Sequence, residues 1–336
     1  MKKCGCFAVV LFLALCLSLL GNLVLIGKKG STASKVGGKT LHTSVGATFD
    51  EETLVEGSEK KVVVIPLQGV IAYNEMGRSG VSMVEEIKVS LEQAEVDANV
   101  VAVVLSVDSP GGEITASDVL YEAVKKFSGK KPVVVFINSI GASGAYYTAC
   151  GANWIMCNPT TFTGSIGVII STLNYQELFG KIGLQSIVFK SGKFKDMLNG
   201  ARAITPEEKA YVQGLIMQSY DRFLGIVVKS RNLNADVLRN GPADGRILSG
   251  EDALAAKLVD EVGYIEQSYT KAMELAGVEN ASVVRYEPSF SFSNFFRMFG
   301  MGAVSKANSK VEVNLLPGHA RLEAGRIYLL PPSFGN

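Results

Sequence analysis

A serine between an apolar run and an aromatic pair is the first candidate for chemistry in this sequence. The stretch "GASGAYYTAC", residues 141–150, follows "PVVVFIN" and holds Ser143 among small residues. A serine at a corner between a strand and a helix acts either as a nucleophile or as a helix cap. The choice depends on whether a side chain can take its proton.

Histidine, the usual proton acceptor for a serine, has no well-placed candidate here. The chain has two histidines; His42 lies in a polar N-terminal stretch and His319 in an irregular C-terminal one. The sequence around Ser143 also lacks the second glycine of the G-x-S-x-G elbow. A Ser-His-Asp mechanism and an ordinary α/β-hydrolase are therefore not expected.

Lysine is the remaining side chain able to act as base for Ser143. Lowering the pKa of a lysine from ~10.4 to about 8 needs roughly 3 kcal/mol of differential desolvation, which a partly dry cleft can supply. The apolar run "LQSIVFK" leads into "SGKFKDM", where Lys193 and Lys195 follow a Ser-Gly turn. The residue pattern does not separate these two lysines, and both also fit solvated loop positions.

Two glycines between a predicted strand and a predicted helix can stabilise a negative charge. In "VLSVDSPGGEITAS" the backbone amide of Gly111 or Gly112 can point into a cleft at the positive end of a helix. Together with the amide of Gly144 it would form an oxyanion hole. An ordinary Pro-Gly turn is the alternative interpretation. The stretch lacks the pattern of a phosphate-binding loop, so no nucleotide site is expected.

The elements that must position these residues alternate between strands and helices. Buried apolar runs separated by amphipathic helices predict an α/β domain with much parallel pairing over residues 61–275. A Thr-Pro-Glu-Glu start predicts a long helix from Thr205. The predicted strands include "KVVVIPLQG", "VVAVVLSV", "PVVVFIN", "SIGVII" and "LQSIVFK".

The N-terminal part of the sequence is predicted to be a membrane anchor followed by a linker. Residues 7–26 are uncharged and match the ~30 Å hydrocarbon core of a bilayer at ~1.5 Å per residue. A cleaved signal peptide or a lipoprotein signal at Cys16 are the alternatives. We assign residues 1–27 to the N-terminus with a transmembrane helix and residues 28–60 to a flexible stalk. Lysines flank both ends of the span, so charge does not decide its orientation.

The composition excludes several other classes of function. The formal net charge is +1, with 33 basic and 32 acidic residues, which argues against a nucleic-acid-binding surface. The five cysteines contain no CxxC pattern and have no ligand-like histidines nearby, so neither a disulfide framework nor a metal site is expected. Residues 276–336 form an irregular tail in which "FSFSNFFRMFG" gathers phenylalanines, typical of a subunit contact, a membrane-surface contact or a tail laid over another part of the protein.

Four motifs in order resemble the signal peptide peptidases of the SppA type. They are "SPGG" at 109–112, "GASGAYY" at 141–147, "TFTGSIGV" at 161–168 and "SGKFKD" at 191–196. The resemblance covers roughly residues 60–275 and matches the short form of the family with one protease domain. It implies a Clp protease/crotonase-like fold, an α/β spiral of strand-strand-helix units.

The resemblance also implies roles for individual residues. Ser143 is the expected nucleophile, Lys195 the general base, and Ser165 the residue that orients the lysine. Gly112 and Gly144 are the expected oxyanion donors. Ala145 stands where the family commonly has a second glycine, and it is also small.

The function implied is that of a serine endopeptidase with a Ser-Lys dyad and no cofactor. Its expected substrates are signal-peptide remnants and other apolar or unfolded peptides. The location that the resemblance implies is a bacterial cytoplasmic membrane, with the N-terminus on the cytoplasmic side and the catalytic domain on the extracytoplasmic side. The family forms ring-like or dome-like homo-oligomers in which neighbouring subunits help build the cleft. The aromatic tail would serve such contacts or occupy a cleft as a regulated substrate.

Two other functions are compatible with parts of the sequence. A non-proteolytic crotonase-like acyl-CoA enzyme would use the glycine oxyanion hole with acidic bases, although the serine and lysine motifs are unexpected there. A catalytically silent membrane scaffold would use neither the glycine oxyanion hole nor the serine and lysine motifs.

Overall fold

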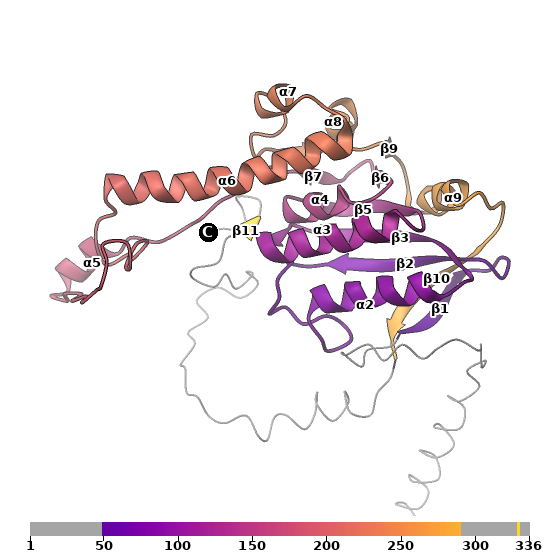
Figure 1. The fold of residues 1–336 in the computed structure, drawn as a ribbon, viewed down its shortest axis with the longest axis horizontal. Helices are drawn as coiled ribbons and strands as arrows, with labels where there is room; N and C mark the ends of the chain where they lie inside the picture. The colour runs from indigo at the N-terminus through magenta and orange to yellow at the C-terminus, as the bar shows by residue number, and fades with distance from the viewer. Residues whose placement is uncertain (1–48, 290–327, 330–336) are drawn as a thin grey trace, which may run out of the picture. The chain divides into compact units, whose positions relative to one another are not determined.

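Valine-rich segments form the centre of a nine-stranded sheet (Figure 1). The computed structural model describes residues 49–289 and the backbone of residues 328–329. The strand order is β1-β10-β2-β3-β5-β6-β9, with β7 beside β5 and β8 beside β7. Pairing is parallel except between β1 and β10 and between β7 and β8, which confirms the predicted α/β class with much parallel pairing. The strands are β1 (Phe49–Val55), β2 (Lys61–Gln68), β3 (Val100–Ser109), β5 (Val133–Ala142), β6 (Trp154–Cys157), β7 (Phe162–Gly164), β8 (Ile247–Ser249), β9 (Glu261–Val262) and β10 (Ser282–Pro288).

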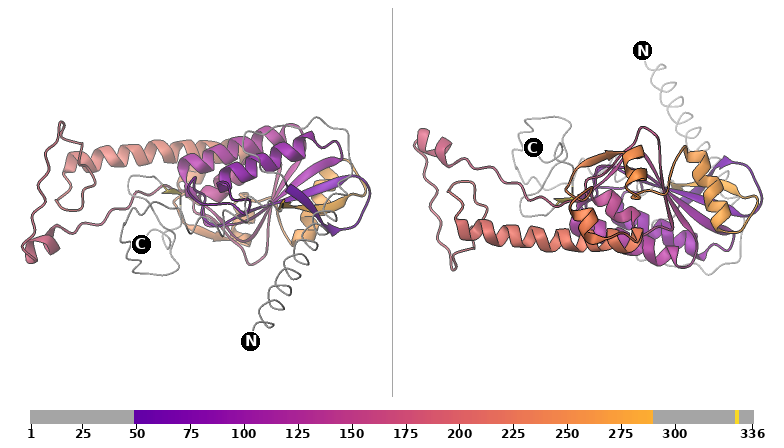
Figure 2. Two further views of the ribbon diagram at one scale, coloured as in Figure 1. Left: turned by 90° about the horizontal axis from the view of Figure 1, so that it is seen from below. Right: turned by 90° about the horizontal axis from the view of Figure 1, so that it is seen from above.

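Helices cover both faces of this sheet (Figures 1 and 2). Successive residues of a strand point to opposite faces, so along β3 Val103 and Leu105 belong to one core and Ala102 and Val104 to the other. The larger core includes buried residues of α2 (Met83–Val96), α3 (Ile114–Ser128), α4 (Gly144–Ala149) and α6 (Pro206–Arg231). The smaller core is closed by α9 (Ile265–Leu275). The short helices α7 (Ala235–Arg239) and α8 (Gly250–Ala255) follow α6.

The predicted long helix begins where the sequence indicates. Thr205 caps α6, and its side chain accepts a hydrogen bond from the amide of Glu208 while the Glu208 side chain accepts one from the Thr205 amide. Three of the buried residues of α6, Phe223, Leu224 and Val227, lie in its C-terminal half. Its N-terminal half leads away from the sheet to residues 171–205, which we call the arm and which include α5 (Gln176–Lys181) (Figures 1 and 2).

Two of the predicted strands are wrong. Residues 184–190, "LQSIVFK", form no strand, because no described strand lies beside them in the arm. Their apolar side chains are exposed instead; Ile187 is 76% exposed and Phe189 95% exposed. The run "SIGVII" is also not a strand, since β7 ends at Gly164, before it begins. Apolar runs of this length predict burial, which holds for Ile166 of "SIGVII" but not for Ile187 and Phe189 of "LQSIVFK".

The sheet extends beyond residues 61–275 at both ends. Phe49–Val55, within the predicted stalk, forms the edge strand β1, and Ser282–Pro288, within the predicted tail, forms β10 beside it. The predicted anchor at 7–26, both histidines and most of the tail lie outside the described residues. Within residues 49–289, no helix is both long enough and apolar enough to cross a bilayer.

Candidate active site

Ser143 occupies a strained corner between β5 and α4. Its backbone has φ 53° and ψ −115°, a conformation that costs a residue with a side chain of order 1–3 kcal/mol. The Ser143 amide donates a hydrogen bond to the Gly164 carbonyl at 2.8 Å, and its carbonyl accepts one from the Tyr147 amide at 2.8 Å. These two bonds hold the serine at the first turn of α4 in a conformation that it would not otherwise adopt.

The hydroxyl of Ser143 is buried and has no partner. The residue has no exposed surface, and its Oγ makes no hydrogen bond within the described part of the chain. Leaving a buried hydroxyl unpaired costs about 1–3 kcal/mol. Backbone strain and an unpaired buried hydroxyl at one residue are typical of a functional site, because neither stabilises the fold.

Parallel pairing brings three of the four motifs to the carboxyl end of β5. Ser109 of β3 pairs with Gly141, so the "SPGG" turn lies beside the Ser143 corner. On the other side, Gly164 of β7 pairs with Ala142, which sets Ser165 one residue beyond the pairing. The carboxyl ends of parallel strands are the usual place for sites in α/β proteins.

Of the two candidate oxyanion glycines in "SPGG", the structure favours Gly112. The Gly111 amide donates to Ser109 Oγ at 3.1 Å and is therefore already used. Gly112 belongs to the two-residue strand β4 (Gly112–Glu113), where a Cβ would lie 2.0 Å from the Ile71 carbonyl oxygen. Only glycine fits this close approach. Gly144, the first residue of α4, is among the first-turn residues whose amides have no carbonyl partner within the helix.

Ser165 is a second buried serine with a positive φ beside the corner. Its φ is 49° and it is 3% exposed. Its amide donates to the Arg246 carbonyl at 2.8 Å, which ties the end of β7 to the segment before β8. Thr163 Oγ1 donates to the Gly141 carbonyl at 2.7 Å and fixes β7 against β5. Arg246 itself pairs with Asp244 at the surface, so its contribution here comes from its backbone.

Two tyrosines fix the helix that follows the nucleophile candidate. Tyr146 donates its hydroxyl to the Leu258 carbonyl at 2.7 Å, and Tyr147 donates to Asp118 Oδ1 at 2.5 Å. Burial raises the pKa of both phenols, so they stay neutral donors. The Tyr147 ring packs on Phe223 of α6 with centroids 4.9 Å apart. Helix α4 is therefore joined to α6 directly.

The fourth motif does not meet the other three within this chain. Lys195 lies in a turn of the arm that contacts the first turn of α6, whereas α4 packs on Phe223 in the C-terminal half of that helix. Glu208 and Phe223 are about four helical turns apart, roughly 22 Å at ~1.5 Å per residue. The four-carbon stem of a lysine does not span that distance.

The two lysines of "SGKFKD" have different surroundings. Lys193 Nζ pairs with Glu207 at 2.6 Å and lies over the Phe194 ring at 5.1 Å. The Lys195 ammonium is exposed and makes no hydrogen bond or ion pair with any residue that the structure describes. Lys195 is thus the one of the two that is free to meet a group outside the described chain.

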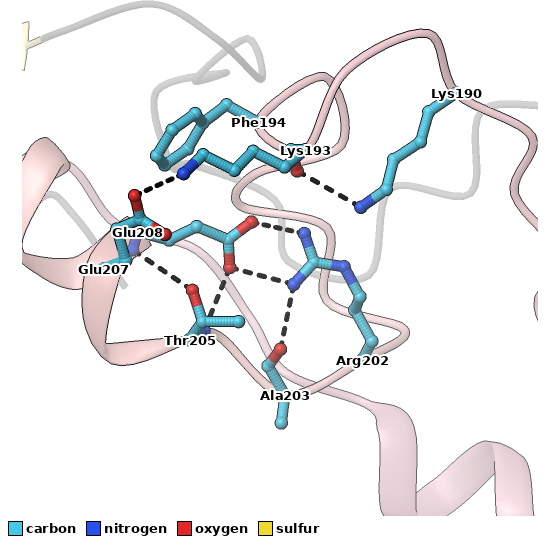
Figure 3. Close-up of a pocket in the computed structure, with 8 residues that line it drawn as sticks. All are labelled: Lys190, Lys193, Phe194, Arg202, Ala203, Thr205, Glu207 and Glu208. Atoms are coloured by element: carbon cyan, nitrogen blue, oxygen red, sulfur yellow. Dashed lines mark hydrogen bonds and ion pairs between the residues drawn. The ribbon is translucent and has the colours of Figure 1, made fainter.

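Sequence analysis missed a cluster of charged residues around Lys195. Asp196, Arg202 and Glu208 form a connected set of ion pairs where the arm meets the first turn of α6. Figure 3 shows the Arg202 and Glu208 part of this set. The charges follow each other within thirteen residues, and Glu208 belongs to the capping box that the sequence does signal. The capping box predicts the start of the helix, but it does not predict that Arg202 pairs with both carboxylates.

A segment from the far end of the chain lies against the candidate oxyanion strand. Strand β11 (Tyr328–Leu329) pairs antiparallel with β4, with Leu329 opposite Gly112 and Tyr328 opposite Glu113. The chain thereby adds one of its own strands to the edge at which the candidate residues gather.

The strain at Ser143 can be measured as a difference in stability. We expect Ser143→Gly to have a free energy of unfolding about 1 kcal/mol higher than that of Ser143→Ala, because glycine adopts this φ without a steric cost. Urea unfolding followed by the fluorescence of Trp154, the single tryptophan, gives the comparison. At Ala149, inside α4, a change to glycine should instead destabilise the fold. Equal stability of the two Ser143 variants would contradict the assigned strain.

Comparison with known proteins identifies the family. The model of peptidase family S49 matches residues 125–279. The chain is 36% identical over 244 residues to a putative signal peptide peptidase SppA of Enterococcus faecium, covering 70% of each chain. It is 40% identical over 196 residues to a putative protease of Methanocaldococcus jannaschii, covering 58% of this chain and 63% of the relative.

One solved structure is also similar, a mutant of the 1510-N membrane-bound stomatin-specific protease. It aligns with a TM-score of 0.45 at 17% identity and covers 69% of this chain and 100% of its own. The family match and the extent of the Enterococcus faecium alignment decide the assignment: the chain belongs to peptidase family S49.

Proposed function

We propose that this protein is a membrane-anchored serine endopeptidase in which Ser143 of one copy and Lys195 of another form a Ser-Lys dyad. The observation that carries the proposal is the Ser143 corner, with its strained backbone and its buried hydroxyl without a partner. Family membership supports a peptidase. The proposed fold class remains the Clp protease/crotonase-like spiral, which the succession of strand, strand and helix along the chain supports.

The separation of the two residues supports an oligomer. Helix α6 keeps Lys195 about four turns away from the contact between α6 and the serine-bearing helix α4. A second copy can supply the lysine that the first cannot bring to its own serine. The exposed apolar side chains of the arm, such as Ile187 and Phe189, support such a contact, because a surface of this kind is stabilised by burial.

In the proposed reaction, the neutral Lys195 amine accepts the proton of Ser143 Oγ. The oxygen attacks the carbonyl carbon of a peptide bond, and the amides of Gly112 and Gly144 donate to the resulting oxyanion. Lysine then returns the proton to the leaving amine as the peptide bond breaks. Water hydrolyses the acyl-enzyme and regenerates the serine. Ser165 donates to or accepts from the lysine and so orients it.

Substrates are proposed to bind as an extended strand along β4. The pairing of β11 with β4 supports this mode, because it uses backbone groups that any peptide possesses. Binding through backbone hydrogen bonds suits unfolded and apolar segments, including signal-peptide remnants, because it does not depend on their side chains. With the predicted anchor at residues 7–26, the proposed site of action is the extracytoplasmic face of a bacterial cytoplasmic membrane.

The first prediction concerns the dyad itself. We expect Ser143→Ala and Lys195→Ala each to lower kcat on a fluorogenic apolar peptide by about 10³-fold or more, since each removes one half of the proton transfer. The matched control is Lys193→Ala, which removes a lysine from the same turn. Full activity in Ser143→Ala, or labelling by a serine-reactive probe elsewhere than at Ser143, would rule out the proposed nucleophile and favour a scaffold.

A second prediction tests whether the dyad forms between copies. Co-expression of Ser143→Ala with Lys195→Ala at equal levels should restore about a quarter of the activity, because half of the serines and half of the lysines remain intact and combine at random. Each variant expressed alone provides the background. A mixture no more active than this background would show that the dyad forms within one copy.

A third prediction concerns the strand that the chain places on β4. Deleting residues 328–336 should lower KM for a peptide substrate with little change in kcat, because it removes an intramolecular competitor present at high effective concentration. Deleting residues 331–336 alone leaves β11 in place and serves as the control. An unchanged KM in the longer deletion would mean that β11 does not compete with substrate.

A further inference from the structure

We propose that Arg202, clamped between Asp196 and Glu208, is a positioning residue that fixes the Lys195 turn to the first turn of α6. This inference rests on the proposed function, because it assigns Lys195 as the base. It concerns three residues to which the family resemblance assigns no role, although Asp196 is the last residue of the "SGKFKD" motif. We call Asp196, Arg202 and Glu208 the clamp; Figure 3 shows Arg202 and Glu208 of this set.

The first half of the clamp grips the residue next to the base. Arg202 Nε donates to Asp196 Oδ2 at 2.8 Å and its Nη2 donates to Oδ1 at 2.8 Å, a bidentate pair. Arg202 Nη2 also donates to the Asp196 backbone carbonyl at 3.1 Å. Lys190 Nζ pairs with the same carboxylate at 2.6 Å. Both the side chain and the main chain of Asp196, directly after Lys195, are therefore held.

The second half of the clamp grips the helix. Arg202 Nη1 donates to Glu208 Oε2 at 2.9 Å, and its Nη2 donates to Glu208 Oε1 at 2.5 Å. Glu208 Oε2 also accepts from the Thr205 amide at 2.9 Å as part of the capping box. One planar guanidinium thus bridges two carboxylates, a geometry that lysine cannot reproduce.

Burial distinguishes the clamp from the surface ion pairs around it. The side chains of Asp196 and Glu208 are 10% and 4% exposed, whereas those of Lys193 and Glu207 are 68% and 61% exposed. Exposed pairs hold little geometry because water competes for them. The buried clamp therefore has a fixed geometry, whereas the exposed Lys193–Glu207 pair does not.

The clamp is charged over the whole range in which the enzyme would work. The Arg202 hydrogen bond, followed by the Thr205 amide, lowers the pKa of Glu208 to about 2, and Arg202 also lowers the pKa of Asp196. Carboxyls with lowered pKa values contribute stability above their unfolded pKa values and lose it as the pH falls through the folded ones. From pH 6 to 10 the clamp therefore does not titrate.

The rest of the arm braces the same turn. A Cβ on Gly200 would lie 1.9 Å from the Leu173 carbonyl oxygen, so the beginning and the end of the arm are in close contact at this point. The Tyr175 amide donates to the Gly200 carbonyl at 2.8 Å. The Phe194 ring, directly before Lys195, packs on Tyr211 of α6 with centroids 5.2 Å apart. The backbone of Lys195 is fixed while its ammonium stays free.

Helix α6 makes this fixation relevant to the reaction. The helix connects the clamp at its first turn to Phe223, which packs on Tyr147 of α4, the helix that directly follows Ser143. The position of Lys195 relative to the core of its own copy is therefore set by the clamp and the helix together. In the proposed assembly, that position decides how the lysine reaches the serine of a neighbour.

The test compares Glu208→Gln with Glu207→Gln, the same chemical change at adjacent positions. Glutamine also completes a capping box, so Glu208→Gln keeps the helix start and removes only the charged partner of Arg202. We expect kcat of Glu208→Gln to fall by about tenfold or more with little change in KM, because a small displacement of a catalytic group costs that much. Glu207→Gln should behave as the unchanged enzyme.

The pH dependence of the rate separates positioning from loss of folded protein. In the proposed assembly the neighbouring copy removes water from around the lysine, and a displaced lysine regains that water. The rising limb of the kcat profile should therefore move to higher pH in Glu208→Gln and stay in place in Glu207→Gln. A partly unfolded preparation lowers the rate at every pH without moving that limb. Arg202→Lys, which keeps the charge without the bidentate geometry, should shift the limb in the same direction and provides the test if Glu208→Gln does not fold.

The outcomes distinguish this inference from the proposed function. If Ser143→Ala and Lys195→Ala abolish activity while the profiles of Glu208→Gln and Arg202→Lys match that of Glu207→Gln, the clamp does not position the base and only this inference fails. If Lys195→Ala is active, the base is misassigned and the proposed function fails first.

Discussion

The hydrogen bond from the Ser143 amide to the Gly164 carbonyl is the contact on which the candidate site depends. It holds a non-glycine residue in a conformation that favours glycine, and it joins β5 to the end of β7. Without it the corner could relax, and the serine hydroxyl would no longer lie between the "SPGG" turn and Ser165. The parallel sheet supplies the other half of the constraint, because its register fixes which residues lie side by side at the strand ends.

Helices and strands whose boundaries are set by neighbouring residues can be predicted well from the sequence. The capping box at Thr205 marks the start of α6, and the apolar run before Ser143 forms β5 as expected. Partners distant in sequence are harder to predict. Strand β1 lies in a polar stretch that gives no strand signal. It is a strand because it pairs with β10, more than two hundred residues later in the chain. The run "LQSIVFK" shows the reverse error, since a strand-like composition does not provide a neighbouring strand.

Some residues of the candidate site can likewise be placed from the sequence, and others cannot. Ser143, Ser165 and the glycine turn each follow a recognisable strand, so their convergence can be anticipated from parallel pairing. The position of Lys195 cannot, because it depends on the length and direction of α6 and on side-chain ion pairs. Arg202 carries no motif of its own. Its role becomes visible only when its two carboxylate partners are seen on either side of one guanidinium.

The length of α6 has a consequence for how such an enzyme is controlled in time. Under the proposed dyad, a chain whose base stands about four helical turns from the contact between α6 and the nucleophile helix would be inert on its own. Under the proposed assembly, a newly made copy carries no hydrolytic activity through synthesis and insertion, when unfolded neighbours surround it. Activity would then depend on the local density of copies in the membrane, and dilution alone would switch it off without any inhibitor.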